Sequence, residues 1–311
     1  MASPADIVRE ASGGGRRQLA RAITLVEAGV AEALDAVAGM RPRRRSAPGA
    51  PHVIGLTGAP GAGKSTLVDG LIGALRDKGL RVGVVAVDPS SPRSGGAVLG
   101  DRIRMERHVG DDGVFIRSVA SRGYVGGLSA TAADVVDLLD VCGYDVVLVE
   151  TVGVGQAETA VVEIADSVVV VLTPESGDAV QAMKAGILEL ADVFVVNKSD
   201  RPGADAVARE LEHAVALGAP EGWVPPVLAT CAAEGRGIAE LVSTLSAHLA
   251  WLVADGRAAW AARRGEGRLR HYLDTVADSA RRGAAQALDP ATEQGLRSGA
   301  ITVRDAVGRR S

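Results

Sequence analysis

One short motif constrains the fold more than any other part of the 311-residue sequence. Residues 58–65 read GAPGAGKS, which matches the pattern G-x-x-x-x-G-K-[ST] at every fixed position. An apolar run at 53–57 precedes the motif, and a helical pattern at 64–78 begins within it. A strand, a glycine-rich loop and a helix in this order are typical of a phosphate-binding loop, so the motif predicts an α/β fold.

The residue types in this loop predict that it holds the phosphates of a nucleotide. Gly58, Gly61 and Gly63 allow backbone N–H groups to surround a diphosphate at the positive end of a helix. We expect Lys64 to reach the β- and γ-phosphate oxygens and the Ser65 hydroxyl to ligate Mg²⁺. The other expected contacts come from Ala59, Pro60, Ala62 and Thr66. An ordinary glycine-rich turn does not require this Lys-Ser pair, so we interpret the chain as a nucleoside triphosphatase or transferase.

Strand-like runs alternate with amphipathic patterns in the central part of the chain. The runs lie at 53–57, 81–88, 114–119, 145–150, 167–172, 193–197 and 226–230. The helical patterns lie at 64–78, 128–142, 157–165, 177–191, 204–217 and 237–254. Alternation of this kind builds βαβ units, so we predict a P-loop NTPase fold with a largely parallel sheet flanked by helices.

Both ends of the chain differ from this central part. A helical pattern at 16–39 and a linker rich in Pro and Arg precede it, and a charged helical sequence follows Gly256. The tail cannot bury a core of its own, so it should pack on the domain or on another chain. We expect an N-terminal helical extension and linker at 1–50, a P-loop domain at 51–255 and a C-terminal helical arm at 256–311.

The composition argues against several classes of partner. The chain is 47% hydrophobic but only 3% aromatic, so aliphatic side chains must form the core. Its formal net charge of −4 gives no reason to expect nucleic acid or a membrane surface as a partner. Cys142 and Cys231 lack metal-ligand spacing, and no apolar run approaches ~20 residues. We therefore expect a cytoplasmic protein with no nucleic-acid or membrane partner.

The stretch NKSD at 197–200 predicts which base is bound. The Asp200 carboxylate can accept hydrogen bonds from guanine N1–H and from the 2-amino group of guanine. Adenine offers neither donor, so Asp200 would remain unpaired against it and GTP should be preferred over ATP. We expect Asn197 to tie this loop to the phosphate loop and the Lys198 stem to cover the base. Backbone N–H contacts to the guanine oxygen are expected from Thr230, Cys231 and Ala232.

Carboxylates beside the phosphate loop predict a magnesium site. Asp88 and Glu150 end strand-like runs, and Asp101 lies in the glycine-rich stretch after Asp88. No threonine occurs between Asp88 and Asp101, so the usual hydroxyl ligand of a first nucleotide switch is absent. We expect a metal set of Ser65, Asp88, Asp101 and Glu150, in which either Asp88 or Asp101 holds the attacking water.

The sequence after Glu150 predicts slow hydrolysis. In VETVGVGQ, Gln156 comes three residues after Gly153, whereas Ras-type switches carry the glutamine directly after the glycine. Val154 follows Gly153 directly, so no side-chain amide is expected where Ras-type enzymes orient the attacking water. Orientation of this water is worth orders of magnitude in rate. We predict that Gln156 enters the site only when a partner moves this loop. The expected catalytic residues are Lys64, Asp88, Asp101, Glu150 and Gln156.

Several longer stretches resemble one family of GTPases. They are ARAITLVE, GLTGAPGAGKSTL, VDPSSPRSGGAVLGDRIRM, ETVGVGQAE, SGDAVQAMKAGILELAD and NKSD, and the resemblance covers roughly residues 16–255. These stretches resemble the MeaB/MMAA group, also labelled ArgK or LAO/AO transport ATPases. Its members are accessory GTPases of adenosylcobalamin-dependent acyl-CoA mutases.

The resemblance implies a cofactor set, a partner and an assembly. It implies that the chain binds GTP or GDP with Mg²⁺ and docks on methylmalonyl-CoA mutase or a close relative. There it would gate the loading of adenosylcobalamin, which belongs to the mutase, and the release of damaged cofactor. By matching position, Ser176–Lys184 would form a third switch that contacts the mutase. The resemblance also implies a homodimer whose arm is formed by the C-terminal helices.

Three other functions stay open on the residues alone. A nickel-type metal-delivery GTPase shares the expected architecture but needs a Cys/His cluster, and the five His residues here are scattered along the sequence. An ATP-dependent kinase or transport regulator conflicts with the guanine-selective Asp200. A nucleotide-gated scaffold would keep the whole site but use binding, rather than hydrolysis, as its output.

Overall fold

The computed structural model divides the chain into two compact units, Met1–Gly267 and Arg268–Ser311. It describes residues 2–13, 15–40, 50–88, 105, 107–108, 110–120, 130–151, 161, 164–175, 191–218, 222–255 and 289–298. In the second unit the described part is helix α11 (Pro290–Ser298), where the Asp289 carboxylate accepts a hydrogen bond from Thr292 N at 2.9 Å. Residues 41–49 and 256–288, which lie next to the two expected domain boundaries, are outside the described residues.

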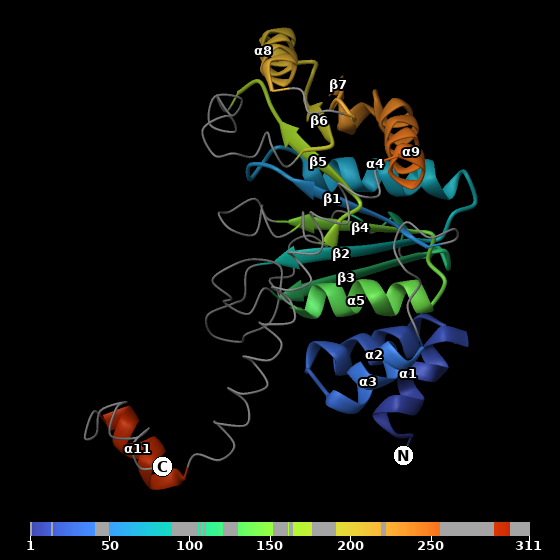
Figure 1. Cartoon of the computed structure of the whole chain (residues 1–311), viewed down its shortest axis with the longest axis vertical. Helices are drawn as coiled ribbons and strands as arrows, with labels where there is room; N and C mark the ends of the chain where they lie inside the picture. Colours follow the sequence, from blue (N-terminus) through green and yellow to red (C-terminus); the bar gives the residue numbers. More distant parts are fainter. Residues whose placement is uncertain are drawn as a thin grey trace. The chain divides into compact units, whose positions relative to one another are not determined.

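A seven-stranded sheet forms the centre of the first unit (Figure 1). Its strand order is β3-β2-β4-β1-β5-β6-β7, and every pairing is parallel, which confirms the predicted fold class. Each expected strand is present with ends that differ by at most one residue. The strands are β1 (His52–Thr57), β2 (Val82–Asp88), β3 (Val114–Ala120), β4 (Val146–Thr151), β5 (Ser167–Leu172), β6 (Val193–Val196) and β7 (Val227–Ala229).

Helices cover both faces of this sheet, as its apolar strands require. Along β1, Ile54 and Leu56 enter the core beneath α4 (Lys64–Arg76) and α9 (Ile238–Ala254). Val53 points the opposite way, into the core shared by α5 (Ala130–Val141) and α8 (Ala204–Leu217). Figure 1 shows α4 and α9 on one side of the sheet and α5 on the other.

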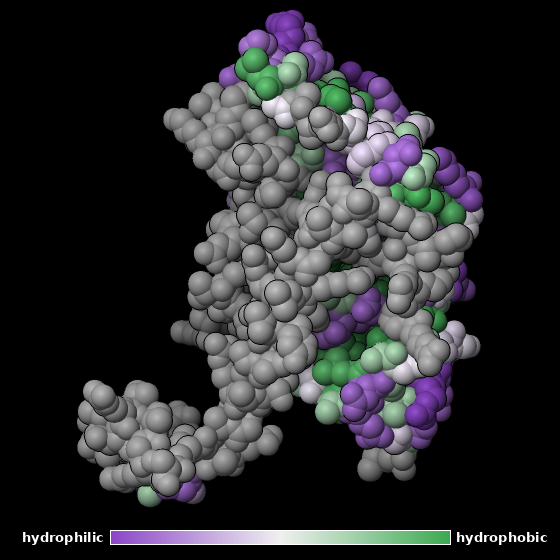
Figure 2. Space-filling view, in the orientation of Figure 1, coloured by the Kyte–Doolittle hydropathy of each residue, from purple (hydrophilic) through white to green (hydrophobic). Residues whose placement is uncertain are grey.

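The amphipathic pattern of α8 illustrates how sequence determines the local structure. Ala204 and Leu211 are buried seven residues apart, and the charged residues between and after them are exposed. Figure 2 shows this helix at the top of the view with a hydrophilic outer surface. Of the expected helices, 177–191 lies outside the described residues except for Ala191, and 157–165 is described only at residues 161, 164 and 165.

Three short helices precede the sheet; the second and third pack on α5, and the first packs on the other two. They are α1 (Pro4–Gly13), α2 (Arg16–Glu27) and α3 (Ala31–Gly39). The helical pattern at 16–39 is confirmed but broken, because Gly29 adopts φ +67° between α2 and α3. Helix α1 was not expected from the sequence, because its buried face is narrow and consists of Ala5, Val8 and Ala11.

Two histidines that are far apart in the sequence contact the same serine at the amino-terminal end of the strands. His52 Nε2 lies 2.7 Å from Ser167 Oγ, and the same hydroxyl lies 2.7 Å from His248 Nδ1. All three residues are buried, and Trp223 packs against the His248 ring with centroids 4.8 Å apart. This polar chain joins the first residues of β1 and β5 to α9, and its burial indicates a structural role.

None of the helices in the described part of the chain has the length and apolar character needed to cross a membrane.

The space around Gly55 in β1 and around Gly73 in α4 predicts opposite effects of changing each glycine to alanine. A Cβ at Gly55 would lie 2.4 Å from Val161 Cγ2 and 2.8 Å from Ala165 Cβ, so Gly55→Ala should destabilise the fold by ~1–3 kcal/mol. A Cβ at Gly73 on α4 meets no atom within 4 Å, so Gly73→Ala should stabilise it by ~0.5–1 kcal/mol. Urea unfolding monitored by circular dichroism measures both, and equal midpoints for the two variants would contradict this packing.

Candidate nucleotide-binding site

The phosphate loop lies between β1 and α4, at the carboxyl edge of the sheet. Gly58 has φ +135°, and a Cβ there would lie 2.1 Å from the Val171 carbonyl oxygen. Gly63 precedes α4 with φ +89°, and a Cβ there would lie 2.4 Å from Asn197 Nδ2. Both positions therefore require glycine for two reasons. The positive φ favours glycine, and a side chain would clash with the end of a neighbouring strand.

Lys64 lies folded back over this loop. Its Nζ donates to the Gly58 and Ala59 carbonyl oxygens at 2.6 and 3.0 Å, and the residue is only 6% exposed. A buried ammonium needs hydrogen-bond acceptors, and here the loop itself supplies them. Phosphate oxygens bound in the loop would compete for the same donor, because an ammonium group bonds more strongly to an anionic oxygen than to a neutral carbonyl oxygen.

Ser65 and Glu150 come together although they are far apart in the sequence. Ser65 Oγ donates to Glu150 Oε1 at 2.7 Å, and both residues are buried. The contact follows from the sheet, since β1 pairs with β4 and Leu56 lies opposite Glu150. A hydroxyl and a carboxylate are oxygen ligands of the kind that Mg²⁺ prefers, so this pair fits the expected metal.

The other expected members of the metal and water network are less fully described. β2 pairs with β4 and ends at Asp88, so the Asp88 backbone reaches the same sheet edge as Glu150. The Asp88 side chain lies outside the described part, as do Asp101, Gln156 and the expected third switch at Ser176–Lys184. Within the described ranges, no three His, Cys, Asp or Glu side chains come close enough to hold a metal ion.

Asn197 joins the phosphate loop to the loops that follow β6 and β7. Its Nδ2 donates to the Ala62 carbonyl oxygen at 2.8 Å. Its Oδ1 accepts hydrogen bonds from Thr230 Oγ1 and Ala232 N, both at 3.1 Å. With its side-chain amide bonded at both ends and the residue only 2% exposed, Asn197 holds three loops in one arrangement.

The structure adds a detail to the expected base-binding residues after β7. Thr230, Cys231 and Ala232 were expected to offer backbone N–H groups to the guanine oxygen. In the structure these groups donate to Val196 O, to Arg236 O and to Asn197 Oδ1. A guanine oxygen would therefore have to share one of these donors or replace its acceptor.

The Cys231 thiol orients the expected guanine-binding carboxylate. Cys231 Sγ donates to Asp200 Oδ1 at 3.2 Å, with Cys231 buried and Asp200 exposed. Donation to this carboxylate, together with burial, raises the pKa of the Cys231 thiol above its ordinary value. The group therefore stays a thiol, and thus a hydrogen-bond donor, at neutral pH.

Glu175 is a residue of this region that the sequence did not single out. Its carboxylate pairs with Arg201 and lies 3.6 Å from Lys198 Nζ. Lys198 itself has φ +57°, which is uncommon for a residue with a side chain. The ion pairs join the turn after β5 to the NKSD loop. A lone Glu in a Thr-Pro-Glu turn carries no sequence signal for this contact.

A family model described as "Methylmalonyl Co-A mutase-associated GTPase MeaB" matches residues 19–286. The chain belongs to the MeaB family. The match includes the phosphate loop, Glu150 and the NKSD loop, and the family and its named relatives identify the chain as a GTPase.

Individual MeaB relatives agree with this assignment. A Pyrococcus horikoshii protein whose description names it only as a candidate GTPase is 48% identical over 258 residues, which cover 82% of this chain and 80% of that protein. GTPase ArgK of Escherichia coli is 38% identical over 268 residues, covering 82% and 79%. The mouse protein described as "Methylmalonic aciduria type A homolog, mitochondrial" is 40% identical over 211 residues, covering 66% and 51%.

A solved structure shares the MeaB fold described above. The crystal structure of a LAO/AO transport system kinase has a TM-score of 0.68 and 27% sequence identity. The similarity covers 98% of this chain and 95% of that one.

The contact between Cys231 and Asp200 predicts the reactivity of the two thiols of this MeaB protein. Asp200→Asn removes the charged acceptor, which should lower the pKa of Cys231 and therefore speed its alkylation at pH 8 severalfold. Cys142, whose pKa burial raises to about 11, should stay unlabelled in both proteins until they unfold. Iodoacetamide labelling followed by mass spectrometry of the two cysteine peptides separates them. Equal Cys231 labelling in both proteins would argue against the contact.

Proposed function

We propose that this GTPase serves an adenosylcobalamin-dependent acyl-CoA mutase, with methylmalonyl-CoA mutase as the first candidate. In that role it gates loading of adenosylcobalamin, which belongs to the mutase, and protects or reactivates the mutase. The family description, which names association with that mutase, supports the proposal, as does the methylmalonic aciduria description of the mouse relative. The proposed nucleotide site rests on one observation: the Asn197 amide holds the phosphate loop and the loop after β7, where guanine is expected, together.

The proposed nucleotide spans the two joined loops. Its phosphates would lie in the loop of Gly58 to Ser65, with Lys64 exchanging its carbonyl acceptors for phosphate oxygens. Guanine would meet the Asp200 carboxylate, which Cys231 holds in place. This arrangement favours GTP and GDP over adenine nucleotides, because Asp200 would stay unpaired against adenine.

The hydrolytic site is proposed at the edge formed by β1, β2 and β4. Ser65 and Glu150 would hold Mg²⁺ together with Asp88 or Asp101, and the ion would neutralise charge on the phosphates. The remaining aspartate would orient the attacking water. Lys64 would stabilise charge that develops on the phosphate oxygens, and Gln156 would contribute only after the mutase moves its loop.

Further parts of the proposal concern the assembly. We propose a homodimer in the cytoplasm in which residues 256–311 form the dimerisation arm, 51–255 the GTPase domain and 1–50 the N-terminal extension. The charged helical sequence after Gly256, too polar for a separate core, supports the role of the arm. Ser176–Lys184 are proposed as the switch that contacts the mutase.

Asp200→Asn tests the proposed base recognition. Loss of two charge-assisted hydrogen bonds of roughly 1.5–3 kcal/mol each should weaken GDP binding by about 10²–10⁴-fold. Xanthosine diphosphate, whose 2-oxo group can accept from the new amide, should gain affinity. Calorimetry with GDP, ADP and xanthosine diphosphate measures this. ADP binding as tight as GDP binding in the unchanged protein would refute the guanine assignment.

The mutase role predicts a partner-dependent rate. GTP hydrolysis by the protein alone should be slow and should rise at least about tenfold when methylmalonyl-CoA mutase is added, because the partner completes water orientation. Phosphate release with and without the mutase is the measurement, with Lys64→Ala as the inactive control. Equal turnover in both conditions would count against an accessory role for this mutase.

A further inference from the structure

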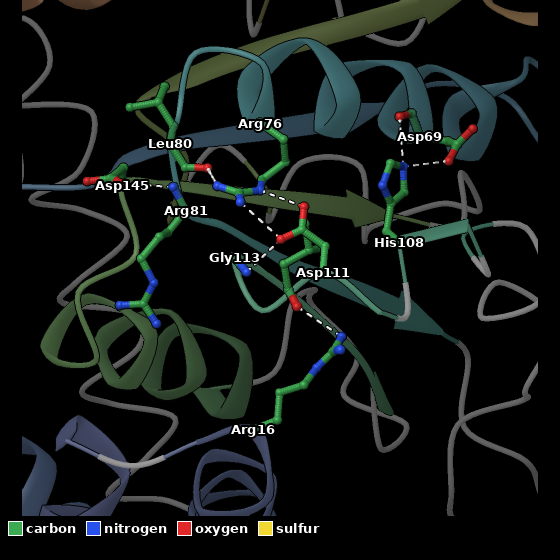
Figure 3. A network of polar contacts seen from close by, with 10 residues as sticks. Arg16, Asp69, Arg76, Leu80, Arg81, His108, Asp111, Gly113 and Asp145 are labelled. Atoms are coloured by element: carbon green, nitrogen blue, oxygen red, sulfur yellow. Dashed lines mark hydrogen bonds and ion pairs between the residues drawn. The ribbon is translucent and has the colours of Figure 1, made fainter.

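One side of α4 holds the segment that leads into β3 (Figure 3). Asp69 accepts a hydrogen bond from Arg107 Nε at 2.7 Å, and Asp69 Oδ1 lies 2.9 Å from His108 Nε2. Two turns further along the helix, Arg76 forms a two-point contact with Asp111, at 2.8 and 3.0 Å. Residues seven apart lie on the same side of a helix, so α4 holds this segment at two places. We call these five residues the α4 clamp.

The distal half of the α4 clamp is built into the start of β3. Asp111 Oδ1 accepts from Gly113 N at 2.8 Å, and Arg76 Nη1 donates to the Leu80 carbonyl oxygen at 2.6 Å. A Cβ at Gly113 would lie 2.2 Å from Arg76 Cζ, so the guanidinium approaches only because this residue is glycine. The Arg76 hydrogen bond also holds the pKa of Asp111 below its ordinary value.

The proximal half of the α4 clamp lies next to a buried anchor. Met105 is fully buried in the core beneath α4, together with Leu67 and Leu71. The Asp69 side chain is 16% exposed and that of His108 is 12% exposed, so water screens this pair less than a surface pair. The burial of Met105 and the contacts of Arg107 and His108 with Asp69 therefore hold these three residues against α4.

The same helix begins with the residues that are proposed to hold phosphate and metal. Lys64 and Ser65 form the first turn of α4, and Asp69 lies little more than one turn further along. Asp101, a proposed member of the metal and water network, stands four residues before Met105 in the sequence. α4 therefore joins the phosphate loop to Met105, Arg107 and His108, which follow Asp101 in the sequence.

We propose that Asp69 is a positioning residue for GTP hydrolysis. Through Arg107 and His108 it sets the downstream end of the Asp101 stretch relative to the phosphate loop, and this role rests on the proposed function of Asp101. Asp69 contacts no expected nucleotide atom, so its loss should change the rate of the chemical step and leave nucleotide binding intact. The distal pair of Arg76 and Asp111 serves the stability of the fold.

The experiment compares variants that each change one aspartate of α4 or of the α4 clamp. Asp69→Asn should lower kcat for GTP by about tenfold, since small displacements of a reacting group are costly, while GDP affinity and KM stay within about twofold. Asp69→Glu, which keeps a carboxylate on this side of α4, should recover most of kcat. Asp111→Asn should lower the melting temperature at least as much as Asp69→Asn and leave kcat unchanged. Asp77→Asn, an exposed change at the end of α4, is the charge control.

The outcomes separate positioning from general stability. A kcat for Asp69→Asn equal to that of the unchanged protein, or a kcat that falls in step with melting temperature in both Asp69→Asn and Asp111→Asn, would overturn the proposal. Asp101→Asn tests the underlying site separately. A reduced kcat in Asp101→Asn with a normal kcat in Asp69→Asn overturns only the positioning role. A normal kcat in Asp101→Asn removes Asp101 from the site, and the positioning role with it.

Discussion

The buried amide of Asn197 is the interaction on which the rest of the site depends. It bonds to Ala62 in the phosphate loop and to Thr230 and Ala232 after β7, so one side chain connects the ends of three βα units. A buried amide left without partners costs about 1–3 kcal/mol, which makes any arrangement that separates these loops unfavourable. The loops expected to bind the phosphates and the base of the nucleotide are therefore held at a fixed distance from each other.

The strand order explains why the metal pair forms where it does. β1 lies between β4 and β5, so Ser65, which follows β1, meets Glu150 at the end of β4. Parallel strands deliver all their carboxyl ends to one edge, and ligands of open α/β sheets bind there. The opposite end of the strands carries the buried polar chain of His52, Ser167 and His248, whose hydrogen bonds join β1 and β5 to α9. One end of the sheet thus carries the residues expected to bind ligand, and the opposite end carries a polar chain that stabilises the fold.

Much of the local structure is readable from residue order. The motif at 58–65 requires a strand before it and a helix after it, and the apolar runs locate every strand to within one residue. Where the prediction failed, the physical cause is visible. α1 buries only a narrow stripe of small residues, which gives a weak periodic signal, and Gly29 breaks the pattern at 16–39 because its positive φ ends a helix.

The sequence alone predicted the chemistry proposed for this protein, namely a phosphate loop, an aspartate expected to select guanine and a set of carboxylates beside them. These are local patterns, and each requires its residue types at short spacing. Only the tertiary structure decided which of them meet. The contacts of Ser65 with Glu150, Cys231 with Asp200 and Asp69 with His108 join separate βα units. Such partners depend on strand order and register, which are set by packing of the whole core rather than by neighbours in the chain.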